Sequence, residues 1–249
     1  MKGITTTIIA KDEEKTIGKA IKSVLSFSSE VIVILDSRTK DKTAQTAKKL
    51  GAKVFKRVFD NFANQKNYAA SKASGEWIFS LDADEIVTPK LAEEIKRTIS
   101  DTDCDAFLIP RRNFLLGGEI KHTRWSPDKH IWLWRKEKGG WVGEVHEEVK
   151  VTGKIGELLH PKIHYQYKKI YEFLEMVNFY TQLEAEEKIK RRFTFSYFKF
   201  FYYPFRSFVG RYFLKLGFLD GWRGFVLSYL MAIYRLVTWV KVWENEKAS

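Results

Sequence analysis

The sequence lacks several features that would assign it to a secreted or common nucleotide-binding class. Its single cysteine, Cys104, excludes an internal disulfide framework and favours a reducing compartment. It has no Gly-x-Gly-x-x-Gly and no Walker loop, which argues against a dinucleotide enzyme or a P-loop NTPase. No secretory signal precedes the first strand pattern. The longest uncharged run of the last helical stretch, 224–234, is too short to span a bilayer.

Positive charge, in contrast, is abundant. The 249 residues include 43 Lys and Arg against 31 Asp and Glu, a formal charge of +12. This excess predicts a polyanionic partner, either nucleic acid or an anionic membrane. The apolar share of 45% is enough for a packed core. We therefore expect one large domain, or one domain with an appendage.

Residues 4–99 alternate between strand and helix patterns four times. Apolar runs at 4–9, 31–35, 53–55 and 77–81 predict strands, and periodic stripes between and after them predict helices. Asp41 is the expected N-cap of the helix over 43–50. Such alternation predicts a parallel sheet with helices on both faces. Ligands bind beyond the carboxyl ends of the strands in such sheets.

The fourth strand runs directly into the acidic sequence Asp82-Ala83-Asp84-Glu85. Strand alternation predicts that Asp82 and Asp84 point the same way, with Ala83 leaving room between them. Two facing carboxylates repel each other unless a cation lies between them. Mg²⁺ or Mn²⁺ would accept these ligands and complete its shell with water and phosphate oxygens. The competing interpretation is an acidic turn without a ligand.

Four blocks in register resemble the family 2 glycosyltransferases of GT-A fold. They are residues 4–13, the turn Asp36-Ser37-x-x-x-Asp41-x-Thr43, the pair Lys66-Asn67, and residues 75–85. The closest likeness is to the lipopolysaccharide-core and cell-envelope glucosyltransferases. The resemblance implies an α/β fold with a mostly parallel sheet, an antiparallel extension and a C-terminal helical appendage on a membrane surface. It places the catalytic domain at 1–168, with a nucleotide-sugar half at 1–100 and an acceptor half at 101–168, and the amphipathic helical region at 169–249.

The same resemblance implies roles for the first two blocks. Thr7 and the backbone near Ala10 and Lys11 would border the uracil or ribose of a UDP-sugar, and Asp36 would bond the base. A plain turn aspartate is the alternative for Asp36.

Roles for the other two blocks follow in the same way. Lys66 would face the diphosphate as a point charge, where many members carry Arg; a solvated helix lysine is the alternative. Asp82, beside Ala83 in the nucleotide-sugar site, would reach the ribose or the metal-bound waters. Asp84 would ligate the metal.

Residues 105–165 show short strand patterns punctuated by glycines, which predict an antiparallel extension of the sheet. Four tryptophans fall there, and they either pack inside the sheet or stack against sugar rings. They are Trp125, Trp132, Trp134 and Trp141.

Inverting transfer needs a base that takes a proton from the acceptor hydroxyl. The stretch Gly143-Glu144-Val145-His146-Glu147-Glu148 concentrates carboxylates beside a histidine. Glu147 is the expected base and Glu144 the alternative; a solvated acidic edge is the competing interpretation. His146 or His164 could complete the metal shell, unless both are structural.

The last third predicts helices over 169–190 and 223–243, with Pro204 breaking or kinking the segment between them. Basic residues mixed with large aromatics describe a surface that lies on anionic lipid. An ordinary packed helical subdomain is the alternative. Such mixtures also bind single-stranded nucleic acid, but the acidic metal site makes nucleic acid a poor fit. We expect a cytoplasmic protein, peripheral on the inner face of the membrane.

Together these patterns predict a metal-dependent, inverting hexosyltransferase. It would move glucose from UDP-glucose onto a lipid-linked envelope saccharide such as lipopolysaccharide core. One alternative is a polyprenyl-phosphate sugar synthase, whose phosphate nucleophile needs less help from a base. Another is a non-catalytic module that binds nucleotide-sugar or lipid.

Overall fold

The computed structural model describes residues 3–143, 147–166 and 169–248. The chain divides into two compact units. The first unit comprises Met1–Arg111 and Lys129–His164, and the second comprises Arg112–Asp128 and Tyr165–Ser249. Each unit has buried apolar clusters of its own, so each is described separately.

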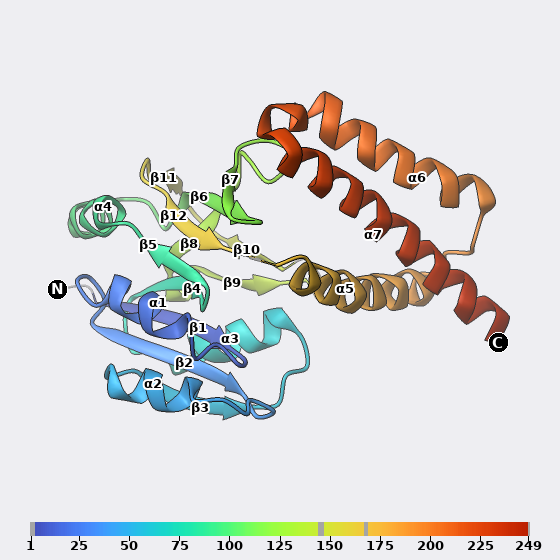
Figure 1. Cartoon of the computed structure of the whole chain (residues 1–249). Helices are drawn as coiled ribbons and strands as arrows, with labels where there is room; N and C mark the ends of the chain where they lie inside the picture. The colour runs from blue at the N-terminus through green and yellow to red at the C-terminus, as the bar shows by residue number, and fades with distance from the viewer. Residues whose placement is uncertain (1–2, 144–146, 167–168, 249) are drawn as a thin grey trace. The chain divides into compact units, whose positions relative to one another are not determined.

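The first unit alternates strands and helices over its first hundred residues, as the sequence predicts (Figure 1). Its elements there are β1 (Ile4–Ala10), α1 (Ile17–Val24), β2 (Glu30–Asp36), α2 (Thr43–Lys49), β3 (Lys53–Arg57), α3 (Phe62–Lys72), β4 (Trp77–Asp82), β5 (Glu85–Val87) and α4 (Pro89–Ser100). The expected N-cap of α2 is wrong by one residue. The cap is Lys42, while the Asp41 carboxylate accepts a hydrogen bond from the backbone N–H of Thr43 at 2.9 Å.

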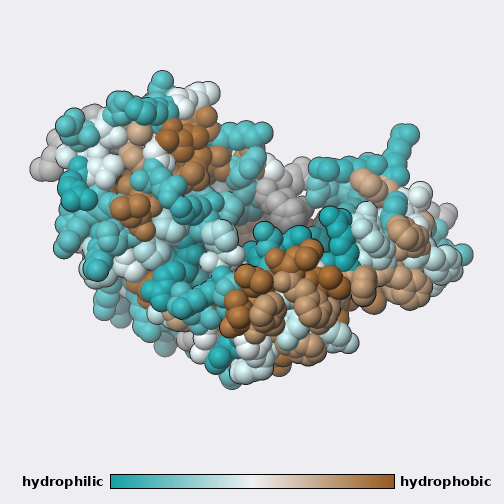
Figure 2. Space-filling view, turned by 90° about the horizontal axis from the view of Figure 1, so that it is seen from above, coloured by the Kyte–Doolittle hydropathy of each residue, from teal (hydrophilic) through white to brown (hydrophobic). Residues whose placement is uncertain are grey.

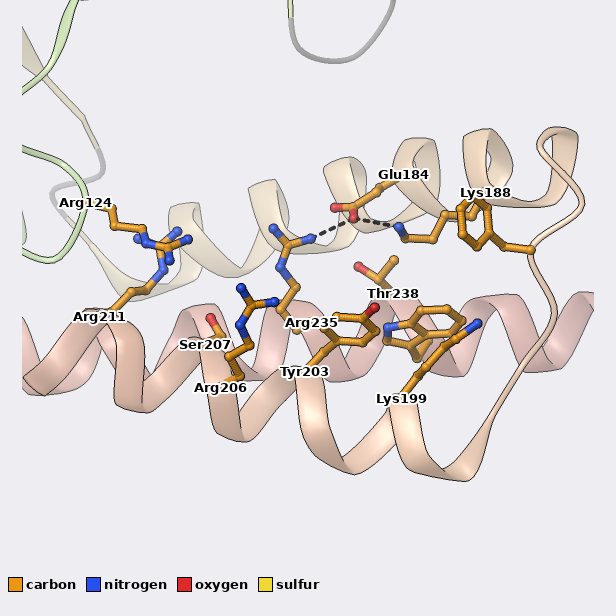
Figure 3. Close-up of a pocket in the computed structure, with 12 residues that line it drawn as sticks. Arg124, Glu184, Lys188, Lys199, Tyr203, Arg206, Ser207, Arg211, Arg235 and Thr238 are labelled. Atoms are coloured by element: carbon orange, nitrogen blue, oxygen red, sulfur yellow. Dashed lines mark hydrogen bonds and ion pairs between the residues drawn. The ribbon is translucent and has the colours of Figure 1, made fainter. Parts of the chain in front are cut away.

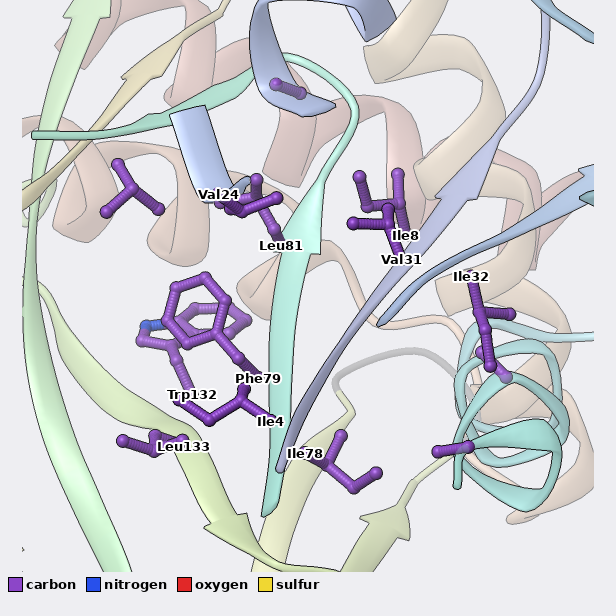
Figure 4. Close-up of a cluster of buried hydrophobic side chains, with 14 of the residues drawn as sticks. Ile4, Ile8, Val24, Val31, Ile32, Ile78, Phe79, Leu81, Trp132 and Leu133 are labelled. Carbon is purple, nitrogen blue, oxygen red and sulfur yellow. The ribbon is translucent and has the colours of Figure 1, made fainter. Parts of the chain in front are cut away.

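Four of these strands form a parallel half-sheet in the order β3-β2-β1-β4. Both faces of β1 and β4 are covered, so almost all of their residues are buried. This burial explains why the two strands read as continuous apolar runs rather than as alternating patterns. Figure 4 shows Ile8 of β1 and Phe79 of β4 among the side chains of this core.

The sheet continues with antiparallel strands, which confirms the predicted extension. β8 (Lys129–Arg135) pairs antiparallel with both β4 and β6 (Ala106–Leu115). The remaining elements of this unit are η1 (Lys136–Lys138), β9 (Gly139–Val142), β10 (Glu148–Val151), β11 (Ile155–Glu157) and β12 (Lys162–Tyr165). Trp132, Trp134 and Trp141 are each at most 5% exposed. These three therefore belong to the core of the sheet rather than to an open sugar-stacking surface.

The second unit is a helical layer with a small hairpin. β7 (Gly118–Ile120) pairs antiparallel with the last residues of β6. The helical elements are α5 (Ile170–Lys190), α6 (Tyr197–Val209), η2 (Gly210–Leu214), η3 (Gly217–Asp220) and α7 (Gly221–Ala248). Phe173 and Val177 of α5 share a buried cluster with Leu227 and Leu230 of α7. Pro204 lies inside α6, so it does not end the helix.

One carboxylate makes three of the contacts that join residues 112–128 to the helices. Asp220 accepts hydrogen bonds from the backbone N–H groups of Lys121 and His122, at 3.1 and 2.9 Å. Its Oδ1 also lies 3.0 Å from the His122 ring. Because Asp220 is almost 100 residues away in sequence, no local sequence pattern predicts this contact.

One helical stretch in the described part of the chain, Gly217–Lys247, is long and apolar enough to cross a bilayer. This corrects the expectation drawn from the short uncharged run, because a few charged residues within such a helix do not exclude a span. This criterion considers length and composition alone. Of the apolar 18-residue segment that meets it, 44% is buried inside the protein. A packed core helix of a soluble protein passes the same criterion.

Truncating the core of the first unit should destabilise it strongly. Phe79 is fully buried, with its ring 5.4 Å from that of Phe27. We expect Phe79→Ala to lower the free energy of unfolding by about 3–5 kcal/mol, through lost burial and the cavity left behind. Urea unfolding followed by circular dichroism measures this. Val58→Ala is the control, because Val58 is 68% exposed; equal effects of the two substitutions would contradict this description of the core.

Candidate active site

The carboxyl ends of β1, β2 and β4 meet at one edge of the parallel half-sheet. Ile9 is in register with both Ile34 of β2 and Asp82 of β4. Asp36 therefore lies at the same edge, two residues beyond the level of Asp82. Neighbouring strands are about 4.8 Å apart, so the two aspartates, separated by one intervening strand, border a common region.

Asp36 is buried and held by the residue two positions further on. Its carboxylate accepts hydrogen bonds from the backbone N–H of Arg38 at 2.9 Å and from the Arg38 guanidinium at 2.6 Å. The Arg38 hydrogen bonds outweigh burial and keep the pKa of Asp36 below its usual value. Asp36 is thus a fixed, ionised acceptor at the end of β2.

The side chain of Lys66 joins two carboxylates that are far apart in sequence. Its ammonium lies 3.3 Å from Asp82 Oδ1 and donates a hydrogen bond to Glu147 Oε1 at 2.9 Å. It also sits over the Trp141 ring, 4.3 Å from the centroid. Burial alone would lower the pKa of Lys66, but Asp82 and Glu147 outweigh it and raise the pKa. Lys66 is therefore a buried permanent cation and not the solvated lysine considered as an alternative.

Asp82 and Asp84 have different environments. β4 ends at Asp82, and Ala83 and Asp84 form a turn before β5, so the strand-alternation argument for their common direction does not apply. Burial would raise the pKa of Asp82, but the positive charges of Lys66 and Lys162 outweigh it and keep the pKa low. Asp84 Oδ2 lies 3.1 Å from Nε2 of His164 on β12. This carboxylate outweighs the effect of burial and raises the pKa of His164.

A fully buried ion pair between Lys162 and Glu85 holds the turn in place. No local sequence pattern indicates this pair. Lys162 of β12 donates to Glu85 Oε2 at 2.5 Å, and Arg111 lies 3.1 Å from Glu85 Oε1. Glu85 Oε2 also accepts the backbone N–H of Asp82 at 2.9 Å. Burial lowers the pKa of Lys162 to about 8, although the negative charge of Glu85 acts to raise it. Glu85 was visible in the acidic motif, but its partners lie 26 and 77 residues away.

Some of these groups border a cleft of about 300 Å³, whereas Asp36, Asp84 and His164 are not among its lining residues. Lys66, Asp82 and Glu147 line it, together with the buried tryptophans Trp132 and Trp141. Further lining residues that the sequence did not single out are Arg111, Lys129, His130 and Glu148. The cleft therefore combines three cationic side chains with three carboxylates, above two largely buried tryptophans, which suits a polar, charged substrate.

The other predicted site residues are placed as follows. Thr7 is buried in β1, Ala10 is the last residue of β1, and Lys11 is exposed just beyond it. Lys11 adds positive charge near Asp36. Glu144 and His146 lie outside the described residues, so the structure does not place the alternative base or the first histidine.

Asp84 and His164 offer one oxygen and one nitrogen ligand at the turn. Within the described ranges, no three His, Cys, Asp or Glu side chains converge into a metal-binding group. Mg²⁺ and Mn²⁺ do not need such a cage, because water and substrate phosphates complete their shells. Burial raises the pKa of Glu13 from 4.5 to about 7, with Asp84, Asp41 and Asp82 adding to the effect. The donor set at this turn therefore fits a divalent cation through the Asp84 carboxylate and the His164 ring nitrogen, which lie 3.1 Å apart.

Comparison with known proteins identifies the family. The model of the family Glycosyl transferase family 2 matches residues 5–148. An uncharacterized glycosyltransferase of Rickettsia typhi is 30% identical over 257 residues, which cover 98% of this chain and 88% of that protein. The chain therefore belongs to glycosyl transferase family 2.

Two further relatives refine the comparison. The lipopolysaccharide core biosynthesis glycosyltransferase LpsC of Rhizobium meliloti is 26% identical over 96% of this chain and 91% of LpsC. Glucosyl-3-phosphoglycerate synthase from Mycobacterium tuberculosis, solved with Mn²⁺, UDP and phosphoglyceric acid, superposes with a TM-score of 0.50. That match covers 75% of this chain and 78% of the synthase at 16% identity, so it bears on the fold alone, which is GT-A.

The raised pKa of Glu13 has a testable consequence for stability. The folded state holds a proton on Glu13 up to about pH 7, whereas an unfolded glutamate releases it near 4.5. Folding stability therefore falls as the pH rises through this window. Glu13→Gln removes that dependence, so its unfolding free energy relative to the wild type should increase from about pH 4.5 to about pH 8.

Urea unfolding in metal-free buffer at several pH values measures this difference. Glu93→Gln is the matched control, because Glu93 is exposed on α4 and its effect should not vary over the same window. A pH-independent difference between Glu13→Gln and the wild type would show that folding does not raise the pKa of Glu13.

Proposed function

We propose that the protein is a metal-dependent, inverting hexosyltransferase that moves glucose from UDP-glucose onto a lipid-linked envelope saccharide such as lipopolysaccharide core. The observation that carries the proposal is the cleft at the end of β4, where Asp82 and Glu147 meet around Lys66. The similarity to LpsC supports the class of acceptor.

The donor would lie along the carboxyl edge of the sheet. Asp36 would accept a hydrogen bond from the uracil, with Thr7 and the backbone at Ala10 and Lys11 forming the floor of that site. Asp82, with Ala83 beside it, would face the ribose. Asp84, with His164 beside it, would hold Mg²⁺ or Mn²⁺. A bound cation supplies neutralisation of the charge that develops on the departing UDP.

Glu147 is the proposed base. In an inverting transfer the acceptor hydroxyl oxygen bonds to the anomeric carbon as the bond from that carbon to the diphosphate oxygen breaks, and the hydroxyl proton passes to the base. The ammonium of Lys66 donates a hydrogen bond to Glu147 Oε1 at 2.9 Å. It also fixes the direction of the carboxylate. Glu144 is the alternative base.

The second unit supports a membrane-linked acceptor. Exposed aromatic residues gather on α6, among them Tyr197, Phe198, Phe201 and Phe205. Figure 2 shows apolar surface lying next to strongly hydrophilic surface on one face of the molecule. Such a mixture anchors proteins in the plane of an anionic membrane surface. We therefore place the enzyme in the cytoplasm, peripheral on the inner face of the cell membrane.

Substitution of Asp84 tests its proposed role as a metal ligand. Asp84→Asn keeps the size of the side chain and removes its charge, so transfer should fall on the order of 100-fold or more while the fold is kept. UDP release from UDP-glucose with membrane extract as acceptor measures transfer, and circular dichroism checks the fold. Titration with UDP-glucose with and without Mn²⁺ provides a second readout. Full activity of Asp84→Asn would remove the metal assignment.

Substitution of Glu147, with its neighbour Glu148 as the control, tests the proposed base. Glu147→Gln should lower kcat by about 100-fold or more, and UDP binding should not weaken. Glu148→Gln is the matched control, because Glu148 lines the same cleft but is exposed and makes only a 4.0 Å ion pair with Lys150. If Glu147→Gln and the Glu144→Gln/Glu147→Gln double variant both stay active, a phosphate nucleophile, and hence a polyprenyl-phosphate sugar synthase, is favoured. UDP-sugar binding by the wild type without UDP release would support a non-catalytic module instead.

A further inference from the structure

The second unit contains a cavity that the proposed transfer reaction does not use. Its volume is about 370 Å³, and α5, α6, η2, α7 and the loop after β7 contribute to its wall. Six cationic side chains line it against a single carboxylate. The cations are Arg124, Lys188, Lys199, Arg206, Arg211 and Arg235, and the carboxylate is Glu184. So strong an excess of positive charge around a partly open cavity favours an anionic occupant.

The one carboxylate lies at one end of the cavity and is paired through Oε1 alone, because its Oε2 is buried without a hydrogen-bond partner. Glu184 accepts a hydrogen bond from Arg235 at 2.7 Å and lies 3.4 Å from the ammonium of Lys188. Figure 3 shows these two contacts, and it shows Arg124 and Arg211 at the opposite end of the cavity, away from Glu184. Among the described residues, neither Arg124, Arg206 nor Arg211 forms an ion pair with a carboxylate.

Arg211 is held in place without being neutralised. Its Nη1 donates to the backbone carbonyl of Thr123 at 2.6 Å, and its guanidinium stacks over Trp125, 5.0 Å from the ring centroid. Burial, together with the charges of Arg124 and Arg235, lowers the pKa of Arg211 to about 10. These contacts fix the orientation of the guanidinium while part of its hydrogen-bonding capacity stays available. A pre-positioned guanidinium of this kind suits a phosphate, which it can bind through two parallel hydrogen bonds.

The cavity also borders an apolar surface. Lys199, Tyr203 and Arg206 of α6 line it, whereas Phe198 and Phe201 of the same helix are about 70% exposed. With 3.6 residues per turn, these two sets fall on neighbouring faces of α6. A phosphate carried by an amphiphile could therefore enter the cavity while its apolar part covers the exposed aromatic face.

We infer that this cavity is a phosphate-binding site, with Arg124, Arg206 and Arg211 as the groups that contact the phosphate. The phosphate belongs either to a lipid headgroup or to a soluble phosphate compound. The site is separate from the cleft at the end of β4 and does not depend on the sugar-transfer proposal.

The first measurement is calorimetric titration of the full-length protein with inorganic pyrophosphate in EDTA, which removes metal-assisted binding at the acidic turn. Arg124→Gln/Arg206→Gln should weaken binding by about tenfold or more. Both side chains are exposed, so the variant should fold. Arg211→Lys keeps the charge and loses the two-pronged geometry, so it should bind more weakly than the wild type. Arg97→Gln/Arg192→Gln is the matched control: it removes two exposed arginines that do not line the cavity.

The second measurement identifies the source of the phosphate. The same proteins are sedimented with phosphatidylcholine vesicles that contain or lack phosphatidic acid. If Arg124→Gln/Arg206→Gln loses binding to phosphatidic acid vesicles and the control does not, the site takes a lipid headgroup. If only pyrophosphate binding is lost, the site takes a soluble phosphate. If the cavity variant and the control behave alike in both measurements, the positive charge is a general surface property and the inference is wrong.

Discussion

The buried ion pair between Glu85 and Lys162 is the contact on which the geometry of the candidate site depends. Both side chains are fully buried, and the pair joins the start of β5 to β12, 77 residues later. The same carboxylate holds the backbone N–H of Asp82. Removing one partner of a buried pair leaves an uncompensated charge and typically costs about 3–5 kcal/mol. The pair thus aligns Asp82, Asp84 and His164 before any ligand is present.

Much of the fold could be predicted because its signals are local. The four apolar runs of the first hundred residues, separated by amphipathic stripes, correspond to β1, β2, β3 and β4, and their pairing is parallel as expected. The loss of helical periodicity after residue 105 correctly indicated antiparallel strands. Burial also decided the question left open for Trp132 and Trp141, which face the core.

What could not be predicted depends on contacts between distant segments. Nothing near Lys66 indicates that it would lie between Asp82 and Glu147, and nothing near Lys162 or Arg111 marks them as partners of Glu85. The strand-alternation argument failed because β4 stops at Asp82, a boundary that apolar patterning does not define to one residue. Similarly, residues 112–128 group with the C-terminal helices through contacts between distant residues, among them those of Asp220 with Lys121 and of Arg211 with Thr123.

The bridge formed by Lys66 has a consequence for ligand binding in the cleft. Its ammonium, on α3, contacts the carboxylate of Glu147, one residue before β10. A diphosphate arriving in the cleft would compete with Glu147 for that single cation. A diphosphate bound to Lys66 would thereby release the Glu147 carboxylate from its counter-ion. Diphosphate binding and the orientation of Glu147 would then be coupled through this one ammonium group.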